Sequence, residues 1–279
     1  PLLDNPDAMA ELRRMFVRYL DTAARNGFGV VMGGLDYRAS PDWGSLLGYS
    51  PQALAEAQLR AIDFLRDVAR PYEGQLPALM YAGVIGPRGD AYLANRTEMA
   101  DEAEEYHSVQ LTALARAGVD LAEAMTLSSI PEVVGLARAA ARADVPLAVS
   151  FTFDHNTSRL LSGLSVKEAI ETIDAQTGDD RPAFYGFNCS HPLEFMPAIE
   201  SGAWFERVRC LRPNAALMDK VSLCTLGHLE SGDPMELGEL MGGLAAQYPH
   251  IDIWGGCCGT WDDHLEQIAR NVTAARAAG

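Results

Sequence analysis

Five cysteines are the residues of this sequence best suited to do chemistry, and all of them lie in its second half. Two are adjacent and are flanked by glycines, in Gly255-Gly256-Cys257-Cys258-Gly259. Disulfide frameworks occur mainly in short secreted chains with an even number of cysteines. An odd number of cysteines in a chain of 279 residues therefore favours reduced thiols, and we expect them to bind a metal.

Three of the cysteines directly follow segments that we predict to be buried strands. Cys189 follows the segment 183–187, and Cys257 and Cys258 follow the segment 251–254. Barrel enzymes carry their active sites at the carboxyl ends of their strands, so these thiols are expected to meet there. Neighbouring side chains of a strand point to opposite faces. Both adjacent thiols can reach one metal only because the flanking glycines let the backbone turn.

Three thiolates would fill three positions of a tetrahedral Zn²⁺ and leave the fourth open, as in a catalytic site. An all-sulfur set suits a thiol as fourth ligand, and Zn²⁺ would deprotonate that thiol. We therefore expect Cys189, Cys257 and Cys258 to be metal-binding and catalytic residues of a thiol alkyltransferase. The alternative for these three is small buried side chains, or a disulfide between Cys257 and Cys258. Cys210 and Cys224 lack such a context and are expected in the core.

Helical and strand-like segments alternate along the rest of the chain. Apolar periodicity and capping residues predict helices over 7–26, 50–70, 97–117, 131–143, 165–176, 234–248 and 261–278, with a short one near 192. Apolar runs predict strands over 28–32, 78–85, 119–125, 147–153, 183–187, 215–218 and 251–254. Nearly continuous apolar strands favour a parallel sheet with helices outside.

The fold class that follows is α/β, a (β/α)₈ TIM barrel over residues 1–279 as a single domain. Because the chain opens with a helix and offers seven strands, the first strand is expected to be missing. Roughly 25 to 30 residues would hold that strand and its loop. A shorter open sheet or a seven-stranded barrel is the alternative.

Composition excludes several classes of protein. With 22 basic and 38 acidic residues the net charge is −16, which disfavours a nucleic-acid binder. Hydrophobic residues make up 48% of the chain, so it is not disordered. The longest apolar runs are far shorter than the roughly 20 residues of a membrane-spanning helix. No signal peptide is recognisable, and a cytoplasmic location is expected.

Several motifs resemble those of the homocysteine S-methyltransferase family, which includes betaine–homocysteine methyltransferase and the homocysteine module of cobalamin-dependent methionine synthase. The most specific are Gly186-Phe187-Asn188-Cys189 and Gly255-Gly256-Cys257-Cys258-Gly259-Thr260, which resemble the zinc motifs of the family. Weaker matches follow the same order along the chain: Gly83-Val84-Ile85-Gly86-Pro87-Arg88-Gly89, Glu123-Ala124-Met125 with Pro131-Glu132, and Ser150-Phe151-Thr152.

The resemblance implies a (β/α)₈ barrel in which Cys189, Cys257 and Cys258 bind Zn²⁺ and Glu123 holds the amino group of homocysteine. Asn188 and Tyr37 are the other expected substrate-binding residues. The implied reaction transfers a methyl group from a sulfonium or ammonium donor to the thiol, which gives methionine. Two departures are visible: the D-G-G motif of the family's first strand does not occur, and Met32-Gly33-Gly34 stands where relatives carry a T-N-T-like run.

Other functions remain open at this point. A barrel of the same family could act on a different thiol, and a protein without enzymatic activity could bind zinc or thiols. The alternative for Glu123 is a salt-bridged structural carboxylate. The expected partners are a small-molecule thiol acceptor and a methyl donor, with no nucleic acid and no membrane, and an oligomer is compatible with the sequence.

Overall fold

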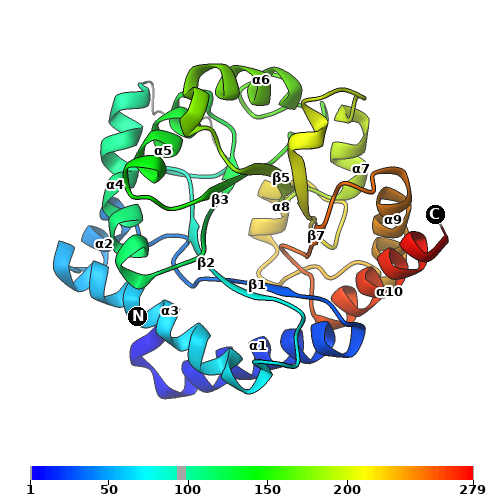
Figure 1. The fold of residues 1–279 in the computed structure, drawn as a ribbon, viewed down its shortest axis with the longest axis horizontal. Helices are drawn as coiled ribbons and strands as arrows, with labels where there is room; N and C mark the ends of the chain where they lie inside the picture. Colours follow the sequence, from blue (N-terminus) through cyan, green and yellow to red (C-terminus); the bar gives the residue numbers. More distant parts are fainter. Residues whose placement is uncertain (1, 93–98, 279) are drawn as a thin grey trace.

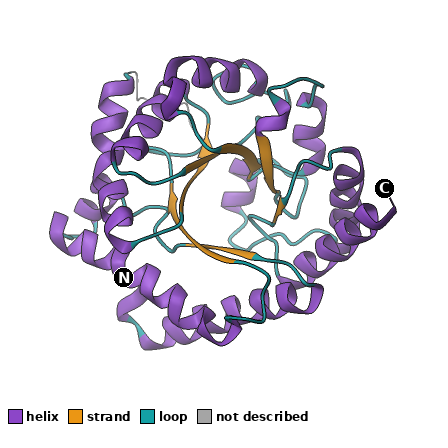
Figure 2. Ribbon diagram, in the orientation of Figure 1, coloured by secondary structure: helices purple, strands orange, loops and turns teal. Residues whose placement is uncertain are grey.

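The sheet consists of seven parallel strands that follow one another in sequence order. A computed structural model describes residues 2–92 and 99–278. The strands are β1 (Val30–Gly33), β2 (Leu79–Ile85), β3 (Leu121–Leu127), β4 (Leu147–Phe151), β5 (Phe184–Asn188), β6 (Val208–Arg212) and β7 (Ile253–Trp254). The sheet curls around a central axis, as Figure 2 shows. This is the predicted (β/α)₈ barrel with one strand missing. Within the described residues, β1 pairs only with β2 and β7 only with β6, so the two end strands do not pair with each other.

Helices surround the strands, most of them as an outer ring, whereas α8 (Lys220–Thr225) lies near the centre of the view in Figure 1. They are α1 (Pro6–Asn26), α2 (Pro41–Leu46), α3 (Pro51–Ala69), α4 (Ala100–Ala117), α5 (Ile130–Arg142), α6 (Val166–Thr177), α7 (Pro192–Phe195), α8 (Lys220–Thr225), α9 (Pro234–Gln247) and α10 (Asp262–Ala278). The helix predicted from residue 97 begins at Ala100, and residues 97 and 98 lie outside the described part. No helix in the described ranges is both long and apolar enough to cross a membrane.

Local sequence signals set the helix ends. Asn5 caps α1 through its side chain, and the helix stops at Gly27, whose φ is 71°. Ser165 and Glu168 form a reciprocal capping box at the start of α6. The core between helices and sheet is apolar on both sides, and all five residues of β4 are buried. Burial on both faces is the reason that the strands were recognisable as apolar runs.

One predicted strand is wrong. Residues 215–218 form no strand, and the sixth strand is β6, which ends at Arg212. Its apolar run is interrupted by Arg209, which pairs with Asp252 at the surface, and by Arg212, which turns into the barrel. Two arginines in five residues concealed a strand whose other side chains are buried.

Candidate metal centre

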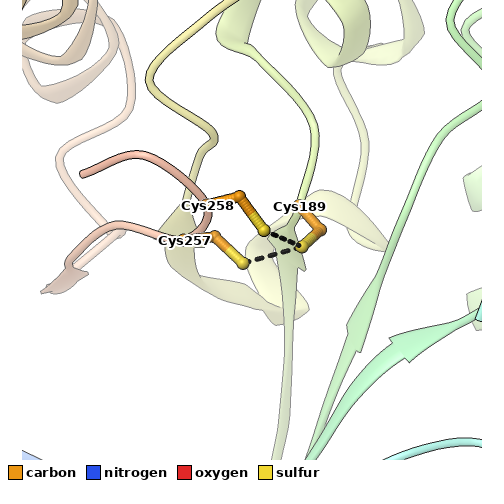
Figure 3. A group of neighbouring side chains, drawn as sticks. All are labelled: Cys189, Cys257 and Cys258. Carbon is orange, nitrogen blue, oxygen red and sulfur yellow. Dashed lines mark hydrogen bonds between the residues drawn. The ribbon is translucent and has the colours of Figure 1, made fainter. Parts of the chain in front are cut away.

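Three thiols converge at the carboxyl ends of β5 and β7, as Figure 3 shows. The Sγ atom of Cys189 lies 2.7 Å from that of Cys257 and 3.7 Å from that of Cys258. All three are free cysteines, so the alternative of a disulfide between Cys257 and Cys258 does not apply. The structure therefore brings together the three residues that the sequence singled out as metal ligands.

The backbone is specially shaped at each thiol. Cys189 has a φ of 53°, which is rare for a residue with a side chain. Gly259, with a φ of 79°, turns the chain directly after Cys258, and a Cβ atom there would lie 2.0 Å from the carbonyl oxygen of Glu230. Gly255 and Gly256 adopt no positive φ, so the predicted turn comes after the cysteine pair and not before it.

Asn214 joins the two cysteine segments, and the sequence analysis did not identify it. Its amide nitrogen donates to the carbonyl oxygen of Cys189 at 3.2 Å, and its Oδ1 accepts from the backbone N–H of Cys258 at 3.2 Å. The side chain is buried, at 2% exposure. Such a bridge between two ligand loops fixes the relative position of their thiols, in the way that outer hydrogen bonds orient metal ligands.

The arrangement fits a tetrahedral thiophilic metal. Zn–S bonds of about 2.3 Å would separate the sulfurs by about 3.8 Å. The 3.7 Å separation of Cys189 and Cys258 meets this value, whereas the 2.7 Å separation of Cys189 and Cys257 would have to widen. A change of χ1 in one cysteine side chain can widen it without movement of the backbone.

Without a metal ion, the three thiols share their protons unequally. Hydrogen bonds with Cys189 and Cys257 lower the pKa of Cys258 to about 3. The hydrogen bond with Cys257 and burial together raise the pKa of Cys189 well above its usual value. At neutral pH the cluster thus carries its negative charge on Cys258, and a cation would displace the protons of the other two.

Two tyrosines border the cluster. Tyr37, an expected substrate-binding residue, lies near Thr126 and the thiols, and burial raises its pKa to about 12. Tyr92 was not predicted, and its hydroxyl donates to the Sγ of Cys189 at 3.4 Å. Burial and the neighbouring Cys189 raise the pKa of Tyr92, so both hydroxyls stay protonated beside the sulfurs.

Glu123 and Arg212 form a bidentate ion pair inside the barrel. Nη1 and Nη2 of Arg212 lie 2.8 and 2.7 Å from the two carboxylate oxygens of Glu123. The exposed fractions of the side chains are 13% for Arg212 and 4% for Glu123. Of the two interpretations of Glu123 that the sequence left open, this geometry favours the salt-bridged carboxylate. Arg212 escaped the sequence analysis because β6 was not recognised.

Asn188 is also fully engaged with the protein. Its Oδ1 accepts from the backbone N–H of Thr126 at 2.8 Å, and its Nδ2 donates to the Thr126 hydroxyl at 3.1 Å. Thr126 lies at an irregularity of β3 and has a φ of 65°. Asn188 therefore ties the end of β5 to the end of β3, and its contact with a substrate stays a prediction.

The two remaining cysteines differ from each other. Cys210 is buried in β6, at 1% exposure, as expected. Cys224 is exposed on α8, so its expected place in the core is wrong. The reason is that α8 has only six residues and keeps Lys220 as its buried side chain.

A cavity of about 850 Å³ runs along the inside of the barrel, between β1 and β7. Its lining at the cysteine end includes Met125, Asn188, Arg212, Gly256, Cys257 and Thr260. The cavity occupies the gap between β1 and β7, the two ends of the sheet, where a closed barrel has a further strand, so its volume exceeds the space for a ligand.

Comparison with known proteins identifies a family and similar solved structures. The family model described as homocysteine S-methyltransferase matches residues 2–272. The homocysteine methyltransferase MmuM from Escherichia coli, in its metallated form, is 18% identical with a TM-score of 0.70, over 96% of this chain and 86% of that chain. Its oxidized form is 19% identical with a TM-score of 0.71, over the same shares of the two chains. At these identities the structural likeness establishes a shared fold.

Proposed function

Because this chain belongs to the homocysteine S-methyltransferase family and is therefore an S-methyltransferase, we propose that it methylates the thiol of homocysteine at a zinc ion bound by Cys189, Cys257 and Cys258. The observation that carries the proposal is the convergence of three thiols from β5 and β7 at one point of the barrel mouth. The metallated form of the Escherichia coli homocysteine methyltransferase supports a metal in the family.

The chain's own residues prepare the site for a thiol. Bound zinc would supply Lewis acidity that ionises the acceptor thiol at neutral pH. Cys258 already holds a negative charge, and Asn214 keeps its loop against that of Cys189. The protonated hydroxyls of Tyr37 and Tyr92 border the sulfurs without competing as bases.

The acceptor would lie between the thiols and the pair of Glu123 and Arg212. Tyr37 is proposed to contact the acceptor, Glu123 to act on it through Arg212, and Asn188 to contribute by holding Thr126 near Tyr37. The carboxylate of Glu123 is already paired, so an acceptor ammonium would meet a carboxylate whose charge is largely neutralised. The product of this reaction is methionine.

A sulfonium such as S-methylmethionine or S-adenosylmethionine is the proposed donor. The negative charge of the thiol cluster favours a cation over a neutral donor, and Tyr92 supplies an aromatic ring beside the cluster. A thiolate can attack the methyl carbon of a sulfonium, so that the new S–C bond forms while the old one breaks and the donor leaves as a neutral thioether, without a further cofactor.

The experiment combines metal analysis with a methyl-transfer assay on homocysteine and each sulfonium. We expect about one zinc per chain and methionine formation in the wild type, and loss of both in C258S. C224S is the matched control, because Cys224 is a free thiol outside the cluster. Zinc binding without any methyl transfer would contradict the proposed reaction, and retention of zinc by C258S would contradict the ligand set.

A further inference from the structure

Arg212 ends β6 at the same edge of the barrel as the three cysteines, and the proposed function leaves it without a task. The described residues that line the cavity include Arg212 and Cys257 but not Glu123. We propose that Arg212 binds the carboxylate of the thiol acceptor, with Glu123 as the positioning residue that holds its guanidinium. This inference rests on the proposed function, because it concerns the acceptor of that reaction.

The guanidinium keeps donors free for a ligand. It has five N–H donors in a fixed plane, and Glu123 takes one from each Nη. Nη1 also donates to the Sδ of Met125 at 4.0 Å, so the unused donors are Nε–H and the second hydrogen of Nη2. In the described part of the chain no residue accepts a hydrogen bond from Nε. Nε and the adjacent Nη form an edge with the spacing of a carboxylate, which Lys would not offer.

Neighbouring residues place this edge beside the cluster. Asn188 is the register partner of Arg212, and the carbonyl oxygen of Arg212 accepts from the N–H of Cys189 at 3.2 Å. Gly255 passes close to the Arg212 stem, since a Cβ atom at Gly255 would lie 3.2 Å from Cγ. The guanidinium and the ligand loop of Cys257 therefore share one wall of the cavity.

Charge also favours a carboxylate at this place. Glu123 is itself a carboxylate, so a substrate carboxylate beside it needs a cation. The described cavity lining contains Arg207, Arg209 and Arg212. The first two lie at the opposite end of β6 and pair with Asp174 and Asp252. Arg212 is the cation of this lining at the cysteine end.

A structural explanation of the pair is weak. A buried ion pair contributes little net stability, because removal of two charges from water costs about as much as their attraction returns. Apolar side chains would fill the same volume without that cost. An arginine that is neutralised from one side and keeps a free planar edge beside the ligand loop of Cys257 fits ligand binding better than it fits packing.

The test measures binding of three thioethers to the whole chain by calorimetry. Methionine carries both groups, 4-(methylthio)butanoate lacks the ammonium, and 3-(methylthio)propylamine lacks the carboxylate. We expect R212Q to weaken the binding of the two ligands that carry a carboxylate by about 10- to 100-fold, the range for loss of a hydrogen bond to a charged group. The amine should bind the wild type weakly, and R212Q should change its affinity by less than about 3-fold, because the amine has no carboxylate to lose a partner.

Further variants separate recognition from folding. E123Q/R212Q removes both charges, so no unpaired buried carboxylate remains, and it should show the same selective loss. R138Q is the matched control, because Arg138 pairs with Asp101 on the outer helices. This variant should bind all three ligands with the affinity of the wild type. R212K keeps the charge without the planar edge and should recover only part of the affinity.

Two results overturn the inference. Tight binding of the amine to the wild type would do so, as would an equal weakening of all three ligands by R212Q. If homocysteine is methylated while either result is found, only the role of Arg212 is lost. If no thioether binds and homocysteine is not methylated, the proposed function fails and this inference fails with it.

Discussion

Replacement of Asp36 by asparagine should stabilise the folded protein at and above neutral pH. Asp36 lies between β1 and α2 and is 2% exposed. Its Oδ1 accepts from the backbone N–H of Val84 at 3.0 Å, and among the described residues its Oδ2 has no partner. Burial raises the pKa of Asp36 to about 7, despite the hydrogen bond from Val84.

The sign and size of the effect follow from this pKa. Below about pH 4 the carboxyl is protonated in both the folded and the unfolded chain, so it costs nothing. As the pH rises to about 7, the unfolded chain releases the proton and the folded chain retains it, so stability falls. The loss is about 1.4 kcal/mol per pH unit and at most about 4 kcal/mol in total. Above pH 7 the loss is constant.

The assay is urea unfolding of the wild type and D36N at several values between pH 5 and pH 8. The free energy of unfolding of D36N relative to the wild type should grow by about 2 to 3 kcal/mol across that range. D63N removes an acidic group that is 74% exposed, and its difference from the wild type should stay nearly constant. A difference for D36N that does not change with pH would refute the reasoning, because Asp36 would then ionise as freely as a carboxyl in water.

Three further predictions concern the thiol cluster. Addition of zinc to the metal-free protein at pH 7 should release about two protons per ion, because only Cys258 is already ionised, and a release of three in a weakly buffered titration would contradict this. G259A forces a Cβ atom to within 2.0 Å of the Glu230 carbonyl oxygen, so thermal unfolding should show a loss of about 1 to 3 kcal/mol, and an unchanged midpoint would show that the turn adapts. N214A removes the bridge between the loops of Cys189 and Cys258, and competition with a chelator should reveal a zinc affinity about 10- to 100-fold lower; equal affinity would remove Asn214 from the metal site.

The sequence alone was sufficient for the barrel and for the three thiols. Strands buried on both faces are apolar over their whole length. In the helices between them apolar residues recur about every 3.6 residues, so both patterns can be read locally along the chain. Cys189 and Cys257 follow such strands directly, and parallel strands bring their carboxyl ends to one edge. Their meeting therefore follows from the order of elements, without knowledge of any side-chain contact.

Contacts between distant residues depended on the tertiary structure. Arg212 lies 89 positions from Glu123, and its charge concealed the very strand that carries it into the barrel. Asn214 resembles any loop asparagine until β5 and β7 are placed beside it. Periodicity reports which face of an element is apolar, but it does not report which buried polar groups satisfy one another.

The physical reason for this division is the range of the interactions. Apolar burial is non-directional, so a sequence pattern is enough to predict where it occurs. Hydrogen bonds and ion pairs require particular atoms within about 3 Å, and strand register decides which atoms those are. The sequence thus determined the barrel and the meeting of the three thiols, and the tertiary structure decided that Glu123 faces Arg212 and that Asn214 joins the loops of Cys189 and Cys258.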